Sequence, residues 1–161
     1  MARYLLVQLD LLHRNREYQP NLWARDEKDR FVWTIEHVLP QTENLPTHWI
    51  QMVGAGDDTK AAEVQSNWVD RLGNLTLSGY NSDLATSSFG KKQQLARDRT
   101  FLGHRINIGY GNGLALNNLP FGVGAGTWTL ATAPEWSAEA IAARTTAMVA
   151  PLVEANKLPG E

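Results

Sequence analysis

Hydrophobic residues repeat at helical spacing in several segments of the chain. Leucines fall on one face of the segment 2–15. Apolar residues also line one face of the segment 58–72, where Asp58 or Thr59 can cap the start and Gly73 follows the end. These patterns predict two helices.

Two further helices are expected in the second half of the chain. In the segment 137–157, Ser137 can cap the first turn, and the acidic Glu139 suits the positive end of a helix. The segment from about residue 82 to residue 97 or 99 also has helical character, although Gly90 costs roughly 1 kcal/mol relative to alanine.

Two short segments have the composition of β-strands. FVWTIEHV, residues 31–38, is β-branched and aromatic and ends near Pro40, while NLTLS, residues 74–78, alternates. The stretch 40–58 is predicted to be a loop with a short helical turn. The stretch 106–126, rich in glycine and asparagine, is predicted to be a long loop that can include a hairpin. This order predicts an α+β fold, mostly helical, around a small two-stranded core.

Composition narrows the class of protein. The 161 residues suit one domain, and 43% of them are hydrophobic. A charged fraction of 20% and a net charge of -2 exclude a disordered tail and a strongly basic nucleic-acid coat protein. The absence of cysteine excludes disulfides and zinc–thiolate sites and favours a reducing, cytosolic setting. The sequence has no apolar run of about 18 residues, so no membrane-spanning helix is predicted.

Three fragments carry candidate chemistry: EHVLPQ from Glu36, LGNLTL around Asn74, and a helix that begins near Asn81. A nuclease that uses one hard metal ion needs a base for water, which histidine supplies because its pKa is close to neutrality. It also needs oxygen ligands from carboxylate or amide side chains. A strand, a second strand and a helix would hold these groups in one place.

The same fragments, in the same order, resemble the HNH or ββα-metal nucleases. More narrowly, they are similar to the C-terminal nuclease domain of modification-dependent restriction endonucleases of the GmrSD and SspE type, in EHxxPQ, LGNLTL, an asparagine-rich turn and F..K. A closing Trp136, Ile141 and Arg144 extends the likeness to roughly residues 2–157. The resemblance implies a ββα-metal (HNH) core at about 31–99, with helical flanks at about 2–15 and 137–157.

By this resemblance, His37 is the general base, Glu36 and Asn81 are metal ligands, and Asn74 braces the loop and orients His37. The expected cofactor is Mg²⁺ or Mn²⁺, with Asp83 or a water completing its shell. The alternatives are an ordinary ion pair for Glu36, a turn residue for Asn81 and a strand-end residue for Asn74.

A basic stretch follows the third fragment. Lys91, Lys92 and Arg97 are predicted to contact DNA phosphates, and the alternative is a solvated helix face. The six tryptophans could stack on bases, but their spacing favours core packing. The remaining histidines lack the spacing of ligands: His13, His48 and His104.

The predicted function is that of a metal-dependent DNA endonuclease that nicks double-stranded DNA and restricts phage or other foreign DNA in the bacterial cytoplasm. The resemblance implies that residues 1–161 form one HNH nuclease domain of a larger protein, whose N-terminal NTPase or sensor domain is its partner. The alternatives are an HNH nuclease that cleaves RNA or acts as a toxin, and an inactive DNA-binding module.

Overall fold

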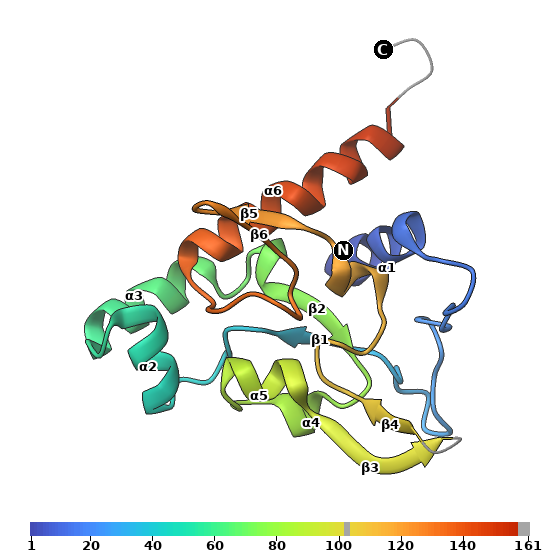
Figure 1. Cartoon of the computed structure of the whole chain (residues 1–161), viewed down its shortest axis with the longest axis horizontal. Coiled ribbons are helices and arrows are strands. Elements are labelled where there is room, and N and C mark those ends of the chain that lie inside the picture. The colour runs from blue at the N-terminus through green and yellow to red at the C-terminus, as the bar shows by residue number, and fades with distance from the viewer. Residues whose placement is uncertain (102–103, 158–161) are drawn as a thin grey trace.

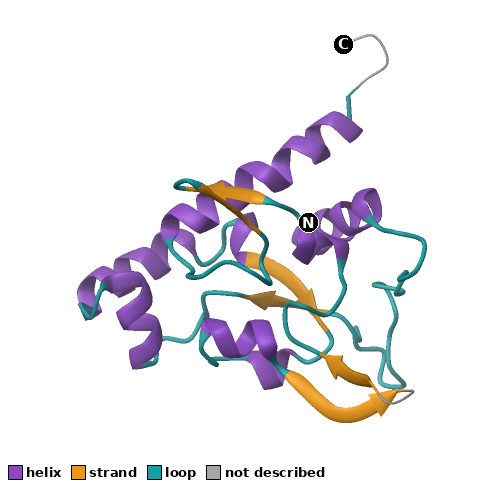
Figure 2. Cartoon of the chain, viewed as in Figure 1, coloured by secondary structure: helices purple, strands orange, loops and turns teal. Residues whose placement is uncertain are grey.

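The computed structural model describes residues 1–101 and 104–157, and the side chains of all of these except 97–101 and 104–106. The fold is α+β and more helical than stranded, as predicted (Figure 2). In chain order the elements of the described residues are α1 (Ala2–His13), β1 (Thr34–His37), α2 (Thr47–Gly54), α3 (Asp58–Trp68), the 3-10 helix η1 (Leu72–Asn74), β2 (Leu75–Ser78), α4 (Asn81–Leu84), α5 (Phe89–Gln94), β3 (Ala96–Phe101), β4 (His104–Asn107), the 3-10 helix η2 (Ala115–Asn118), β5 (Phe121–Val123), β6 (Gly126–Trp128) and α6 (Ala138–Ala155).

The two predicted strands pair at the centre of the molecule. β1 and β2 are antiparallel, with Glu36 opposite Thr76 and His37 opposite Leu75. Figure 1 shows this pair between α6 with the β5–β6 hairpin on one side and α4 with α5 on the other. Both faces are covered, and all four residues of β2 are therefore buried. The motifs singled out in the sequence thus lie on or beside a central strand pair.

The segment between β1 and β2 folds as two helices. α2 is a full helix of eight residues where the sequence suggested a short turn. The cap of α3 is Asp57, whose side chain accepts a hydrogen bond from the Lys60 backbone nitrogen at 3.0 Å, so the expected cap at Asp58 or Thr59 is off by one or two positions.

The single helix predicted from residue 82 to 97 or 99 is wrong. The chain forms the short helices α4 and α5, and then turns into β3, which pairs with β4. Leu84 and Phe89 are both buried in one core cluster. In a continuous helix, residues five positions apart point about 140° away from each other, so the break between them lets both reach the core. Ala85, at φ 27, stands at this break.

The glycine-rich region 106–126 contains part of the predicted hairpin. β5 and β6 are antiparallel and pair Phe121 with Trp128, and Gly124 adopts φ 58 in the turn between them. The short helix η2 precedes this hairpin and was not predicted.

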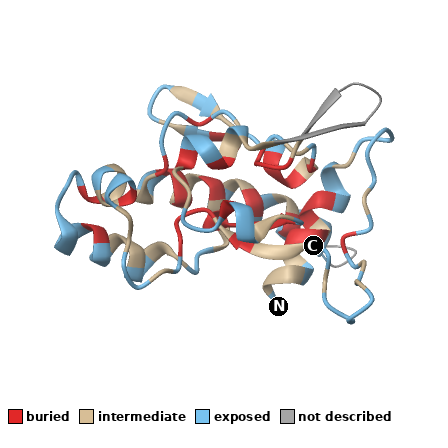
Figure 3. Cartoon of the chain, turned by 90° about the horizontal axis from the view of Figure 1, so that it is seen from below, coloured by how far each residue is buried: buried red, intermediate tan, exposed pale blue. Residues whose placement is uncertain are grey.

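The two flanking helices confirm the sequence patterns. α1 spans Ala2–His13, and α6 spans Ala138–Ala155 with the Ser137 hydroxyl accepting from the Ala140 nitrogen at 3.2 Å. Buried residues concentrate along the central elements (Figure 3). They form two clusters, one rich in aromatic residues around Trp49, Phe89 and Trp136, the other rich in leucines where α1, β2 and α6 meet.

The tryptophans divide between core and surface. Trp49 and Trp136 are fully buried, whereas Trp23 is 45% exposed. Core packing is thus confirmed for two of the six, and Trp33, Trp68 and Trp128 pack against the core while partly exposed. Within the described residues, no helix combines the length and apolarity that a membrane span requires.

Candidate active site

A cavity of about 290 Å³ opens where β1 ends and α4 begins. Glu36 and His37 reach it from β1, and Asn81 reaches it from α4. Three of the residues predicted to carry chemistry therefore share one cavity, although Asn81 is distant from the other two in sequence. The complete lining consists of Ile35, Glu36, His37, Pro40, Gln41, Thr42, Asn81, Ala85 and Thr86.

His37 is partly buried at the edge of this cavity. Its Nε2 lies 3.5 Å from Oδ1 of Asp70, and that same oxygen accepts a hydrogen bond from Nε2 of Gln41 at 3.1 Å. Desolvation by burial lowers the pKa of His37, and the nearby Asp70 carboxylate opposes this shift. His37 is therefore neutral at neutral pH, which is the state that can accept a proton.

Asn81 joins α4 to β1. Its Nδ2 donates to the carbonyl oxygen of Ile35 at 2.8 Å. This bond consumes a donor of the amide and leaves the acceptor Oδ1 outside the contact. The geometry thus holds the side chain of Asn81 at the cavity that His37 also lines, with its amide oxygen outside this bond.

Glu36 is buried and forms an ion pair, which is the alternative that its sequence context allowed. Its Oε1 accepts from Nζ of Lys92 at 2.7 Å and from the hydroxyl of Tyr110 at 3.3 Å. Burial raises the pKa of Glu36 and lowers that of Lys92, and the pairing between them opposes both shifts. Burial also raises the pKa of Tyr110, which keeps its hydroxyl protonated as a donor.

The prediction that Lys92 contacts DNA phosphates is wrong. Lys92 has no exposed surface, because α5 places it on the same buried face as Phe89, three residues earlier. Its neighbour Lys91 is exposed, and its contact with DNA stays a prediction. The side chain of Arg97, on β3, lies outside the described residues, as does that of His104.

Asn74 is buried away from the cavity and braces the chain around it. Its Oδ1 accepts from the Leu39 nitrogen at 2.8 Å and from Nε1 of Trp136 at 2.9 Å. Its Nδ2 donates to the carbonyl oxygens of Leu39 at 3.0 Å and Val69 at 2.8 Å. None of these bonds reaches the ring of His37, so the predicted orientation of His37 by direct hydrogen bonds from Asn74 is wrong, whereas Asn74 does hold the loop that follows β1.

The rest of the LGN motif is the contact between η1 and α6. A side chain on Gly73 would overlap the carbonyl oxygen of Ile141, and the Gly73 nitrogen donates to the hydroxyl of Thr145 at 3.0 Å. The buried guanidinium of Arg144 donates from Nη1 to the carbonyl oxygens of Gly73 at 2.6 Å and Leu75 at 2.9 Å. Burial lowers the pKa of Arg144 to about 10, so it stays charged.

Sequence reasoning missed Asp70 and Tyr110 and misassigned Lys92. Asp70 stands four residues before Asn74 with no motif of its own, and Tyr110 lies in the glycine-rich segment predicted to be loop. The F..K spacing was the available signal for Lys92: residues three apart on a helix share a face, and Phe89 marks that face as buried.

The residues of the cavity fit a hard divalent cation that keeps several waters. No group of three or more His, Cys, Asp or Glu side chains clusters as a metal site within the described part of the chain. Mg²⁺, however, is commonly held by one or two protein oxygens and water. Glu36 and Asn81 offer a carboxylate and an amide oxygen at the same cavity. Asp83 is exposed and does not line it.

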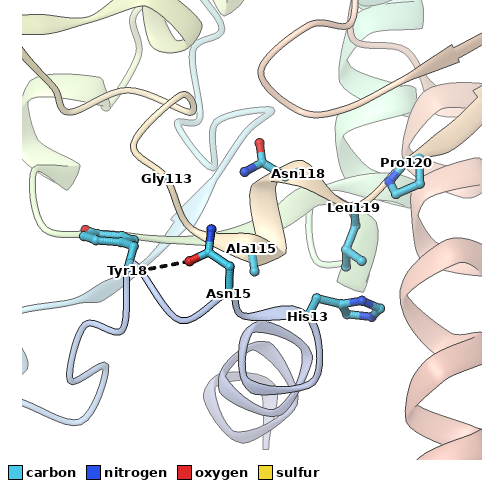
Figure 4. A pocket seen from close by; sticks show the side chains of 8 residues that line it. All are labelled: His13, Asn15, Tyr18, Gly113, Ala115, Asn118, Leu119 and Pro120. Atoms are coloured by element: carbon cyan, nitrogen blue, oxygen red, sulfur yellow. Dashed lines mark hydrogen bonds between the residues drawn. The ribbon is translucent and has the colours of Figure 1, made fainter.

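A second cavity lies at the end of α1 and has a different character. Its volume is about 230 Å³, and it lies between the α1 end and the segment 113–120 (Figure 4). Asn15 and His13 contribute from one side, and the Asn15 side chain accepts from the Tyr18 nitrogen at 3.0 Å. This cavity contains no predicted site residue.

A comparison with models of known protein families identifies the family to which the chain belongs. The model of the C-terminal domain of the GmrSD restriction endonucleases matches residues 2–150. The chain belongs to this family. It is therefore a restriction-endonuclease domain, and the matched region includes His37, Asn74 and Asn81. No curated protein and no solved structure matches the chain.

Proposed function

We propose that this GmrSD-type C-terminal domain is a metal-dependent DNA endonuclease of the HNH class that nicks double-stranded DNA. The observation that carries the proposal is the convergence of Glu36, His37 and Asn81 on one cavity. Glu36 and His37 lie on β1, and Asn81 begins α4, the helix that follows β2. This placement supports the proposal of a ββα-metal core. The family membership supports nuclease chemistry.

His37 is the general base in this proposal. Asp70 lies next to Nε2, so the neutral tautomer that carries hydrogen on Nε2 is favoured and Nδ1 is the basic atom. Within the described residues, Nδ1 of His37 has no hydrogen-bond partner. His37 accepts a proton from a water aligned with the phosphorus, a role that typically contributes about 10²–10⁴-fold to a rate.

Glu36 and Asn81 would hold the cation. A bound Mg²⁺ or Mn²⁺ supplies charge neutralisation at the scissile phosphate and at the departing 3′-oxygen. The protein orients the two ligand oxygens: Asn81 is tied to Ile35, and Glu36 is held through Oε1. Both side chains are therefore already oriented before the substrate binds.

DNA binding and biological setting extend this proposal. The exposed Lys91 lies on α5, the helix after α4, and its positive charge suits a contact with a DNA phosphate. One site of this kind cuts one strand per event, so a double-strand break needs a second nick. By resemblance, an N-terminal NTPase or sensor domain licenses cleavage of foreign DNA in the bacterial cytoplasm.

The test is to incubate the protein with supercoiled plasmid, and separately with RNA, in Mg²⁺, Mn²⁺ or EDTA. Conversion of plasmid to open circle in metal but not in EDTA is expected. Cleavage of RNA alone would favour the RNA-cleaving alternative. Binding to DNA without cleavage in either metal would favour the inactive module and contradict the proposal.

A further inference from the structure

Lys92 places an ammonium group against the end of β1. Its Nζ lies 2.7 Å from Oε1 of Glu36, 3.0 Å from the carbonyl oxygen of His37 and 3.0 Å from that of Val38. An ammonium group has three N–H donors, and these three acceptors use all of them. One side chain of α5 therefore holds both the carboxylate of Glu36 and the backbone that follows it.

Stability alone does not account for a lysine at this position. Lys92 is fully buried beside Phe89 and the ring of Trp49. Taking a charge pair out of water costs several kcal/mol per ion, and apolar residues of similar volume often stabilise a buried site as well or better. A buried lysine at this position is explained if its role is to orient its acceptors, the Glu36 carboxylate and the backbone carbonyl oxygens that follow it.

Tyr110 acts on the same oxygen from another part of the chain. Its ring is fully buried and packs against Phe89, with a centroid distance of 6.3 Å. Its hydroxyl donates to Oε1 of Glu36, the atom that Lys92 also contacts. Both donors therefore converge on one oxygen and leave Oε2 outside these contacts, while Glu36 lines the cavity.

We propose that Lys92 and Tyr110 are positioning residues that hold Glu36 by Oε1, so that Oε2 faces the cation in the cavity, and that Lys92 also holds the backbone of His37. This inference rests on the proposed function, because it assigns the outer support of that metal site. Two adjacent lysines thus have different proposed roles: Lys91 contacts DNA at the surface, and Lys92 supports Glu36 from the interior.

The test measures metal binding directly. Mn²⁺ is titrated into the protein without DNA, and free Mn²⁺ is followed by its electron paramagnetic resonance signal. The variants are Tyr110→Phe, which keeps the ring, and Lys92→Met, which keeps the chain length without the charge. Lys91→Met is the matched control in this titration, since it removes the same charge one position away. Circular dichroism and thermal melting establish that each variant is folded.

Support groups of metal ligands typically contribute 10–100-fold to metal affinity. Lys92→Met is expected to weaken Mn²⁺ binding by about 10–100-fold, and Tyr110→Phe by about tenfold, at the lower end of that range. Lys91→Met should bind Mn²⁺ as the parent does. If Lys92→Met does not fold, Tyr110→Phe decides the question alone.

Folded Tyr110→Phe and Lys92→Met proteins that bind Mn²⁺ as tightly as the parent, or more tightly, would overturn the inference. Tighter binding by Lys92→Met would mean that the ammonium only competes with the cation. Plasmid nicking by the parent, measured in parallel, separates this result from a failure of the proposed function. If the parent nicks plasmid and the variants bind Mn²⁺ as the parent does, only the positioning role is refuted. If the parent neither binds Mn²⁺ nor nicks plasmid, both the positioning role and the proposed function are refuted.

Discussion

Two asparagines, Asn74 and Asn81, occupy opposite kinds of environment within a short distance along the chain. Asn74 is fully buried, and its amide makes four hydrogen bonds to protein groups. Asn81 is partly exposed, makes one side-chain bond to β1 within the described residues and lines a cavity.

The same contrast divides the whole site into an inner half and an outer half. The inner half comprises Gly73 and Arg144, which join η1 to α6, and Asn74, which holds the loop after β1. None of these residues lines the cavity. The outer half comprises His37, Asn81 and Asp70, which face the cavity or its edge. Substitutions in the inner half should therefore lower stability, and substitutions in the outer half should lower activity in a protein that remains folded.

The largest expected effect falls on the outer half. His37→Ala should reduce plasmid nicking by about 10²–10⁴-fold, because it removes the proposed proton acceptor. The melting temperature should change little, since His37 is only partly buried. His13→Ala, an exposed histidine at the other cavity, is the control and should nick as the parent does. A His37→Ala protein that nicks at the parental rate would refute the mechanism.

The inner half should respond to Asn74→Ala with a loss of stability. The substitution leaves buried groups of Leu39, Val69 and Trp136 without partners, and unfolding free energy should fall by roughly 2–4 kcal/mol. Denaturant unfolding measures the change. Asn67→Ala, at an exposed position of α3, is the control and should stay within about 0.5 kcal/mol of the parent. Equal stability of the two variants would argue against the bracing role.

A smaller loss is expected from Gly73→Ala. The added methyl group would overlap the Ile141 carbonyl, and overpacking of this kind costs about 1–3 kcal/mol. Gly90→Ala is the matched control, because a side chain there has no atom within 4 Å and alanine favours the helix by roughly 0.5–1 kcal/mol. Thermal melting should move in opposite directions for the two variants, and a shared direction would contradict the packing of η1 on α6.

The smallest expected effect concerns pH. The proposed base works when neutral, so the rate should fall as pH drops through the pKa of His37, which burial places below the ordinary value of 6.5. Asp70 raises the pKa of His37, and Asp70→Asn should therefore move this acidic limb to still lower pH. The shift should be small, because Asp70 is 79% exposed and water screens its charge. A shift toward higher pH would contradict the assignment.

The sequence alone determined most of the main helices, the central strand pair and the set of candidate site residues in this protein. Periodicity located α1, α3 and α6, β-branched residues located β1 and β2, and the motifs predicted that His37, Glu36 and Asn81 belong together. These features are local in origin: an apolar stripe, a cap or a strand preference depends on neighbours a few residues away.

Only the tertiary structure decided which motif residues face water. Lys91 and Lys92 are identical in sequence terms, yet one is exposed and the other fully buried, because α5 turns its Phe89 face onto the core. The partners of Glu36 come from α5 and from the segment before η2, and no local pattern relates Lys92 or Tyr110 to a residue of β1. Pairing across the fold is a property of the packed chain, so neither spacing nor composition could assign these partners of Glu36.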